Sequence, residues 1–328
     1  MSTPLLDIED LSITFGEKTA AVRGASFQIG RGETHCIVGE SGCGKSVSAL
    51  AIMNLLVRSA KRTAKRLSFA GEDLLGMDER KMARIRGNRM AMIFQEPMTS
   101  LNPAYTIGSQ LTESYRRHKR APQSEAVERA VKLMGRVGIT APEIRLGQFP
   151  HQLSGGLRQR VMIAMALMCE PELLIADEPT TALDVTVQAQ ILRLLNELKD
   201  EFGLSILLIT HDLGVVARVA DHVSVMYAGE VVERASAAQL FADPQHPYTR
   251  GLLSCIPVPG RLDRDKPLGS IPGVVPQIAV GFGGCAFRSR CSFADGECAG
   301  QIPSQTATAG HTYLCRLTPA SQRERATA

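Results

Sequence analysis

The chain has 328 residues, which is enough for one large domain and an appendage. Hydrophobic residues make up 44% and charged residues 21%, which excludes a largely disordered chain, and a net charge of +4 is too small to indicate nucleic-acid binding. No apolar run approaches the roughly 18 residues of a membrane span, and the first residues show no signal peptide. We therefore expect a cytosolic chain whose eight cysteines stay reduced.

The first third of the chain predicts a small β layer and then a phosphate-binding element. Alternating apolar residues predict short strands at 6–8, 11–15 and 25–29. A buried strand is expected at 35–38 and a helix at 45–56, with glycines between them. The connecting segment matches the pattern GxxxxGK[ST], in which backbone N–H groups surround the β- and γ-phosphates of a nucleotide.

This motif predicts a nucleotide site, which we favour over a chance glycine-rich turn because a strand precedes it and a helix follows. Lys45 would neutralise the phosphates, and the Ser46 hydroxyl would bind Mg²⁺. The residues expected to contact the phosphates or the metal ion are Gly39, Ser41, Gly42, Cys43, Gly44, Lys45 and Ser46.

The middle of the chain predicts helices that alternate with buried strands. Helical spacing is found at 107–119, 124–137, 156–169 and 186–200. Apolar runs at 173–176 and 206–209 are typical of strands buried on both faces of a parallel sheet, and residues 223–232 predict a hairpin that turns at Ala228-Gly229. The alternation indicates an α/β core with a helical subdomain and a smaller β layer.

Two carboxylates follow the strand predicted at 173–176. Asp177 would reach the Mg²⁺ shell through water, and Glu178 would act as the base for the attacking water or would orient it. Adjacent carboxylates beside several phosphate charges favour a bound Mg²⁺ ion. The alternative is a helix cap before Pro179. His211 follows the next predicted strand and, taken alone, is more typical of a structural hydrogen bond.

Leu153-Ser154-Gly155-Gly156 opens a predicted helix ahead of this acidic strand and resembles the signature of ATP-binding cassette (ABC) ATPases. The two glycines allow backbone N–H groups to approach a phosphate, and the helix directs its positive dipole end toward it. In that family the signature serves the ATP that the facing subunit holds, so the resemblance implies a partner cassette. Leu157 stands where many members carry glutamine, which we expect function to tolerate because Ser154 and the glycine backbone make the phosphate contacts.

The resemblance implies an α/β fold of the ABC-type P-loop NTPase class, with a RecA-like core, an N-terminal antiparallel β layer, a helical signature subdomain and a small loop-rich C-terminal extension. It also implies roles for three further residues. Gln95 would touch Mg²⁺ and sense the membrane subunit, Asp184 would cross the dimer interface, and His211 would meet the γ-phosphate and the attacking water. Phe15 is the candidate for stacking on adenine, with a plain core aromatic as the alternative.

The composition changes after about residue 243, where seven prolines up to Pro276 mark an extended segment. We predict an ATPase domain over 1–255, with a helical subdomain at about 97–170, and a proline-rich, cysteine-containing extension over 256–328.

Four cysteines gather in this extension without the tight CxxC pairs of most zinc ribbons. They are Cys285, Cys291, Cys298 and Cys315. Four thiolates suit a [4Fe–4S] cluster or Zn²⁺, and free thiols are the third possibility. The extension resembles the family's C-terminal region, which is associated with a [4Fe–4S] cluster. His311 could replace one thiolate, although we favour a surface histidine there.

Four strings resemble the ATPase subunits of dipeptide and oligopeptide importers, namely residues 93–103, 150–156, 176–186 and 246–249. The resemblance implies an ATPase that energises peptide uptake from the cytoplasmic face of the inner membrane. Its partners would be a second homologous ATPase subunit, in a heterodimer rather than a homodimer, two transmembrane permease subunits and, indirectly, an extracytoplasmic substrate-binding protein, with no nucleic acid. The alternatives are import of nickel, opines or glutathione, and a soluble ABC ATPase acting on nucleic acid.

Overall fold

The computed structural model describes residues 3–96, 100–181, 183–256 and 269–318. The described residues leave out 97–99 at the start of the predicted helical subdomain, Ala182 two residues before Asp184, and 257–268 and 319–328 of the predicted extension. The chain divides into two compact units. The phosphate-loop unit comprises Leu6–Ile29, Thr34–Leu75 and Thr210–Ala328, and the signature unit comprises Met1–Leu5, Gly30–Glu33 and Gly76–Ile209. The domain boundary near residue 255 remains a prediction.

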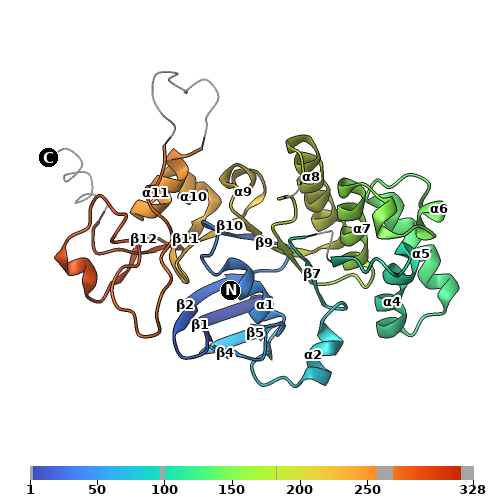
Figure 1. Ribbon diagram of the computed structural model, residues 1–328, viewed down its shortest axis with the longest axis horizontal. Coiled ribbons are helices and arrows are strands. Elements are labelled where there is room, and N and C mark those ends of the chain that lie inside the picture. Colours follow the sequence, from blue (N-terminus) through green and yellow to red (C-terminus); the bar gives the residue numbers. More distant parts are fainter. Residues whose placement is uncertain (1–2, 97–99, 182, 257–268, 319–328) are drawn as a thin grey trace. The chain divides into compact units, whose positions relative to one another are not determined.

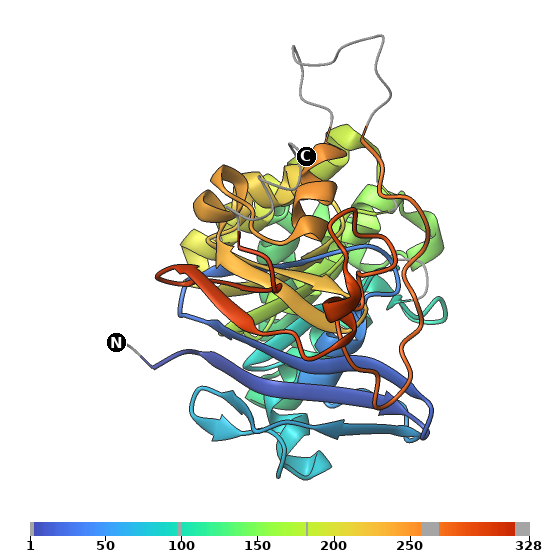
Figure 2. The ribbon, with the colours of Figure 1, turned by 90° about the vertical axis from the view of Figure 1, so that its left-hand side faces the viewer.

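An antiparallel sheet forms the N-terminal part of the phosphate-loop unit, as the alternating pattern predicts. Its order is β2-β1-β5-β6, and β4 also pairs with β1 (Figure 2). The strands are β1 (Leu6–Phe15), β2 (Thr19–Ile29), β4 (Ala60–Thr63), β5 (Arg66–Phe69) and β6 (Glu72–Asp73). The two strands predicted at 6–8 and 11–15 are one strand. It is irregular between Ile8 and Leu11, where Asp10 adopts a φ of 57° and the strand bulges without ending.

The same unit contains strands of a second sheet in the order β12-β13-β11-β10-β3. They are β3 (Thr34–Val38), β10 (His222–Tyr227), β11 (Glu230–Ser236), β12 (Ser304–Thr308) and β13 (His311–Leu314). β3 and β10 are parallel, and β10 and β11 form the predicted hairpin around Ala228 and Gly229, both of which have positive φ. The C-terminal strands therefore extend the sheet that carries the phosphate loop.

The helices of this unit are α1 (Lys45–Ile52), α9 (Leu213–Val219), α10 (Ala237–Ala242) and α11 (Pro247–Ser254), with a short 3₁₀ helix at Gly296–Ala299. α1 ends four residues before the predicted end at residue 56. The reason lies in the next turn, where Asn54 takes a left-handed backbone (φ 52°) that an α-helix cannot continue through.

Parallel strands and helices make up the signature unit. β7 (Met90–Ile93), β8 (Leu173–Asp177) and β9 (Ser205–Thr210) lie side by side in that order. The helices are α2 (Glu79–Ile85), α4 (Ile107–Lys119), α5 (Gln123–Arg136), α6 (Pro142–Leu146), α7 (Gly155–Leu167) and α8 (Val185–Phe202), with a 3₁₀ turn at Pro150–Gln152. α4, α5, α6 and α7 pack together, which confirms the predicted helices of this region (Figure 1). Among the described residues, no helix has both the length and the apolar character that a membrane crossing requires.

His35 of β3 is a buried histidine of the phosphate-loop unit. Its ring is 1% exposed, stacks on Phe27 at 5.1 Å and shares a 2.9 Å hydrogen bond with the Ser224 hydroxyl. Burial, with smaller contributions from His222 and Arg234, lowers the pKa of His35 to about 3. The folded-state pKa lies below the ordinary 6.5, so the unfolded chain binds more protons between these values and stability falls as the pH falls through this window.

We therefore expect His35→Gln to flatten the acid dependence of stability. Between pH 7 and pH 5 the wild type should lose about 2 kcal/mol of unfolding free energy through this residue, and the variant should not. Urea unfolding at the two pH values measures the difference. The exposed His151→Gln is the control, and equal pH dependence of both variants would contradict the expectation.

Candidate functional site

A glycine-rich loop joins β3 to α1, and two of its glycines are fixed by close backbone approaches. Gly39 has a φ of 154°, and a Cβ there would lie 2.1 Å from the Met226 carbonyl oxygen. Gly44 has a φ of 95° at the N-cap of α1, and its Cβ would lie 2.4 Å from the Ala21 carbonyl oxygen. Any other residue at either position would displace the loop from β10 or β2.

Lys45 lies at the start of α1 and is only 4% exposed. Its Nζ donates hydrogen bonds to the carbonyl oxygens of Gly39 at 2.8 Å and Glu40 at 2.9 Å. The ammonium group is therefore held across the mouth of the loop. Ser46 follows in the first turn and is half-buried, and Ser41 and Gly42 are exposed at the tip. The N–H groups and the dipole of a helix N-terminus favour a phosphate at this place.

Cys43 can serve the loop only through its backbone, because its side chain is fully buried. Its N–H lies 3.4 Å from the Glu40 carbonyl oxygen, and its own carbonyl accepts from the Gly229 N–H at 3.0 Å. Burial raises the pKa of the Cys43 thiol. The thiol is thus a core group, and the Cys43 carbonyl connects the loop to the β10–β11 turn.

Glu178 in the signature unit has an unusual backbone. Asp177 is the last residue of β8 and is 4% exposed. The next residue, Glu178, has a φ of 44°, which costs a non-glycine residue about 1–2 kcal/mol and is typical of functional positions. Its N–H donates to the Ile209 carbonyl at 2.9 Å, which fixes this conformation. The carboxylates do not cap a helix, since Asp184 caps the next described helix, α8.

The carboxylate of Glu178 receives two side-chain hydrogen bonds. Gln95 Nε2 donates to Oε2 at 3.2 Å, and the Thr181 hydroxyl donates to the same oxygen at 2.8 Å. Gln95 follows β7 and is exposed. The structure therefore brings together Gln95 and Glu178, which are far apart in the sequence. Thr181 is a residue that sequence reasoning missed, although its place three residues after the glutamate could have suggested this contact.

Ser154 and Asp184 both cap helices and are exposed. Ser154 is the N-cap of α7, where its hydroxyl accepts from the Leu157 N–H at 3.4 Å, and Gly155 and Gly156 form the first turn. Asp184 is the N-cap of α8 and accepts from the Val187 N–H at 2.9 Å. Both segments present helix N-termini that a second molecule could reach.

Two predicted residues of the phosphate-loop unit lie at element ends. Phe15 is the last residue of β1 and is partly exposed, unlike Phe27 and Phe69 of the same sheet, which are buried. His211 directly follows β9 and is exposed. The predicted nucleotide residues are thus divided between the units. Phe15, the loop and His211 belong to one unit, and Gln95, Asp177, Glu178 and the signature belong to the other.

The four cysteines of the extension lie close enough to interact electrostatically. Burial, with smaller contributions from the thiols of Cys291, Cys315 and Cys298, raises the pKa of Cys285 to about 11. Cys315 Sγ accepts from the Leu317 N–H at 3.4 Å. Within the described part of the chain, no three His, Cys, Asp or Glu side chains are arranged to hold a metal ion.

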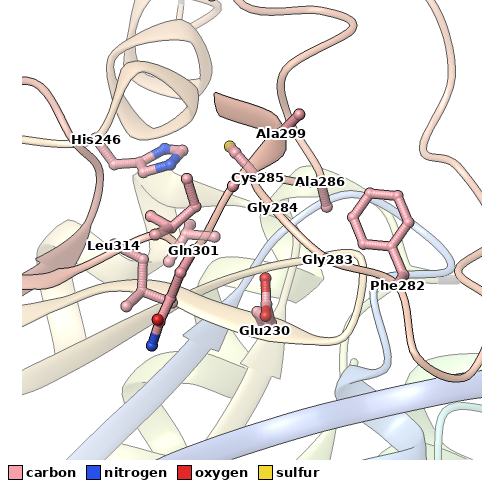
Figure 3. Close-up of a pocket in the computed structure, with 13 residues that line it drawn as sticks. Glu230, His246, Phe282, Gly283, Gly284, Cys285, Ala286, Ala299, Gln301 and Leu314 are labelled. Carbon is pink, nitrogen blue, oxygen red and sulfur yellow. The ribbon is translucent and has the colours of Figure 1, made fainter. Parts of the chain in front are cut away.

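Cys285 also borders a pocket of about 420 Å³ (Figure 3). Glu230, His246 and Phe282 contribute to the pocket wall, and none of the predicted nucleotide residues does. The pocket is therefore a feature of the extension and of the strand it packs against, apart from the phosphate loop.

The prediction of a surface histidine at position 311 is wrong. His311 is 2% exposed, and its Nε2 lies 2.7 Å from Glu233 Oε1. Glu233 also accepts from the backbone N–H groups of Gln245 at 2.7 Å and His246 at 2.8 Å. His311 therefore joins β13 to β11 in the interior, and its partner is this carboxylate. No local sequence pattern indicates this pairing, because Glu233 lies 78 residues away.

Comparison with known proteins yields two family matches. Residues 22–181 match the ABC transporter family, and residues 232–298 match the C-terminal region of oligopeptide and dipeptide transporters. The second match includes three of the four clustered cysteines, Cys285, Cys291 and Cys298.

Full-length relatives and a solved structure agree with these matches. The chain is 52% identical to the "Probable peptide ABC transporter ATP-binding protein" of Sinorhizobium fredii, over 95% of this chain and 94% of that protein. It is 49% identical to the dipeptide transport ATP-binding protein of Bacillus subtilis, with 95% and 94% covered. Its fold is similar to that of the dimeric ATP-binding cassette MJ0796 bound to ADP and Pi, with a TM-score of 0.63, 27% identity, and 71% of this chain and 98% of that chain covered.

Proposed function

This chain belongs to the ATP-binding proteins of ABC transporters, and we propose that it is the ATP-hydrolysing subunit of a peptide importer. The observation that carries the proposal is the similarity, along almost the whole chain, to ATP-binding proteins of peptide transport, including the C-terminal region typical of that branch. The phosphate loop and the constrained Glu178 supply the chemistry that such a subunit needs.

The chemistry is assigned to the residues as follows. The loop over 39–46 would hold the β- and γ-phosphates, with Lys45 moving from the loop carbonyls to the phosphate oxygens. A Mg²⁺ ion held through Ser46, Gln95 and Asp177 would neutralise phosphate charge. Glu178, with its carboxylate fixed by Thr181, would orient the attacking water and accept its proton. His211 would meet the γ-phosphate, and Phe15 would stack on adenine.

A second cassette completes this assignment. Ser154, Gly155 and Gly156 would bind the ATP held by the partner, and Asp184 would lie at the interface. The dimeric MJ0796 cassette supports a two-cassette arrangement, and we favour a homologous but different ATPase chain as the partner. Two permease subunits would receive the motion at the cytoplasmic face of the inner membrane, and an extracytoplasmic protein would supply the peptide.

Uptake of a labelled dipeptide tests the function. Cells that lack this chain should lose uptake, and wild-type protein, but not Glu178→Gln, should restore it. Loss of nickel, opine or glutathione uptake with normal dipeptide uptake would move the substrate to that class. Normal transport of all four, with ATP hydrolysis stimulated by nucleic acid, would contradict the importer and favour a soluble ATPase.

We further propose that the four clustered cysteines hold a [4Fe–4S] cluster that fastens the extension to the sheet. Two observations support this, namely the mutual electrostatic interactions of the thiols and the N–H···S bond to Cys315. The described side chains as they lie are not arranged around a metal ion, so binding the cluster would draw the thiols together. A cluster would contribute folding energy to a segment with little core of its own.

Removing one ligand should remove the cluster. Wild-type protein purified without oxygen should carry about four iron atoms per chain, and Cys298→Ser should lose this iron. Cys255→Ser, which changes a cysteine outside the group, should keep the iron. Wild-type protein that contains zinc and no iron would refute the cluster and support the Zn²⁺ alternative. Wild-type protein that contains neither metal would refute both hypotheses.

A further inference from the structure

An ion pair within the phosphate-loop unit joins the C-terminal extension to the phosphate loop. Arg290, the neighbour of Cys291, lies against Glu40, the second residue of the loop. Its Nη1 is 2.7 Å from Glu40 Oε2, and its Nη2 is 3.0 Å from Oε1. Such a two-point contact fixes the direction of the carboxylate as well as its position.

The Arg290 side chain is itself firmly oriented. It is 4% exposed. Its Nε donates to the Pro272 carbonyl at 2.7 Å, and its Nη2 donates to the Ile271 carbonyl at 3.0 Å. The guanidinium cannot turn away from Glu40 without leaving buried donors unpaired.

Glu40 is also held through its backbone. Its N–H donates to the Tyr248 hydroxyl at 2.9 Å, and its carbonyl accepts from Lys45 Nζ at 2.9 Å. When Lys45 turns to the phosphates of a bound nucleotide, this carbonyl loses that partner. The hydrogen bonds that Glu40 makes with Arg290 and Tyr248 do not involve Lys45. They therefore keep Glu40 in place when Lys45 moves.

The same segment of the extension packs against the residues that support the loop. Phe287 is 4% exposed, and its ring lies 5.2 Å from that of Tyr227 and 5.3 Å from that of Tyr248. The Arg290 N–H donates to the Phe287 carbonyl at 2.9 Å, so the two side chains are carried on one short turn. The turn lies between Cys285 and Cys291, and its conformation sets where the guanidinium is.

We propose that Arg290 is a positioning residue for the phosphate loop and that, through Glu40, it lets the C-terminal extension raise the affinity for ATP. The inference rests on the proposed function, because it takes the loop as the ATP site. A loop that is already fixed in its binding conformation loses less entropy when the nucleotide binds. Removing the Arg290–Glu40 contact should therefore lower the affinity for ATP. The chemical step uses other residues and should proceed at its normal rate once ATP is bound.

Arg290→Gln in the full-length chain tests the proposal. We expect the Kd for a fluorescent ATP analogue with Mg²⁺ to rise about tenfold, with kcat at saturating ATP in the assembled transporter close to that of the wild type. Arg288→Gln is the matched control. It removes the same charge from the same turn, where Arg288 contacts the Phe282 ring at 4.8 Å and the Gly283 carbonyl at 3.0 Å, and it should leave the Kd unchanged.

A double-variant comparison separates positioning from a general loss of structure. Glu40→Gln should weaken binding as Arg290→Gln does, and the double variant should bind no worse than either single one, because both changes break one contact. If the double variant lost as much ATP affinity as the two single variants together, the proposal would be overturned. Wild-type ATP affinity in Arg290→Gln would overturn it as well. If Arg290→Gln does not fold, the Kd of Glu40→Gln serves as the test, because this variant leaves the sequence of the extension unchanged. A wild-type Kd in Glu40→Gln would then overturn the proposal. A wild-type chain that binds no ATP would instead refute the proposed function.

Discussion

Replacing Glu178 by glutamine is expected to lower ATP turnover at least about 100-fold while ATP binding persists. The amide keeps the shape and can still contact Thr181, but it cannot accept a proton or attract the attacking water as a carboxylate does. The backbone of this residue, with its positive φ, sets the direction of the side chain. The glutamine side chain should therefore point to the same place, and the change in turnover should come from the lost carboxylate. The variant should therefore retain ATP and stay in the closed dimer.

Two measurements check this expectation in the assembled transporter, the rate of phosphate release and the amount of ATP that remains bound after gel filtration. Glu201→Gln is a suitable control, since Glu201 is an exposed glutamate of the same unit that pairs with Arg136. Thr181→Ala should lower turnover less than Glu178→Gln, because it removes one of the hydrogen bonds that orient the carboxylate. Wild-type turnover in Glu178→Gln would remove this residue from the chemical step.

The second large effect is expected at Lys45. Lys45→Ala should weaken MgATP binding at least about 100-fold, since it removes several charge-assisted hydrogen bonds to the phosphates. The alanine also removes the bridge from α1 to the carbonyls of Gly39 and Glu40, so the empty loop should become less rigid. Turnover should then be lost because the site is empty, in contrast to Glu178→Gln, in which the site is filled.

Titration with a fluorescent ATP analogue measures the loss, and a thermal melt shows whether the chain is folded. Lys61→Ala is the control, because Lys61 is an exposed lysine on β4 of the same unit. An affinity in Lys45→Ala within about twofold of the wild type would contradict the assignment of the loop. If the two variants of Lys45 and Glu178 behaved alike in ATP retention, the separation of binding from hydrolysis would fail.

Much of this molecule follows from short stretches of sequence. The helix predicted at 107–119 coincides with α4, and the strands at 173–176 and 206–209 each differ from β8 and β9 by one residue or less at either end. The phosphate loop was predictable because each glycine and the lysine act within eight residues. Periodicity and turn chemistry are local properties, and a single chain displays them directly.

Only the tertiary structure decided which distant side chains meet. Arg290 reaches Glu40 across 250 residues, and Glu178 meets Gln95 across 83. His311 was expected at the surface and instead pairs with Glu233 in the interior. Such pairs depend on which strands become neighbours and on which face each side chain lies, and charge type alone allows many other partners. The sequence by itself therefore determined the family, and it predicted the nucleotide-binding loop and the residues with catalytic chemistry. The fold decided how the C-terminal extension supports that loop, because the ion pair between Arg290 and Glu40 forms only where folding brings two distant segments together.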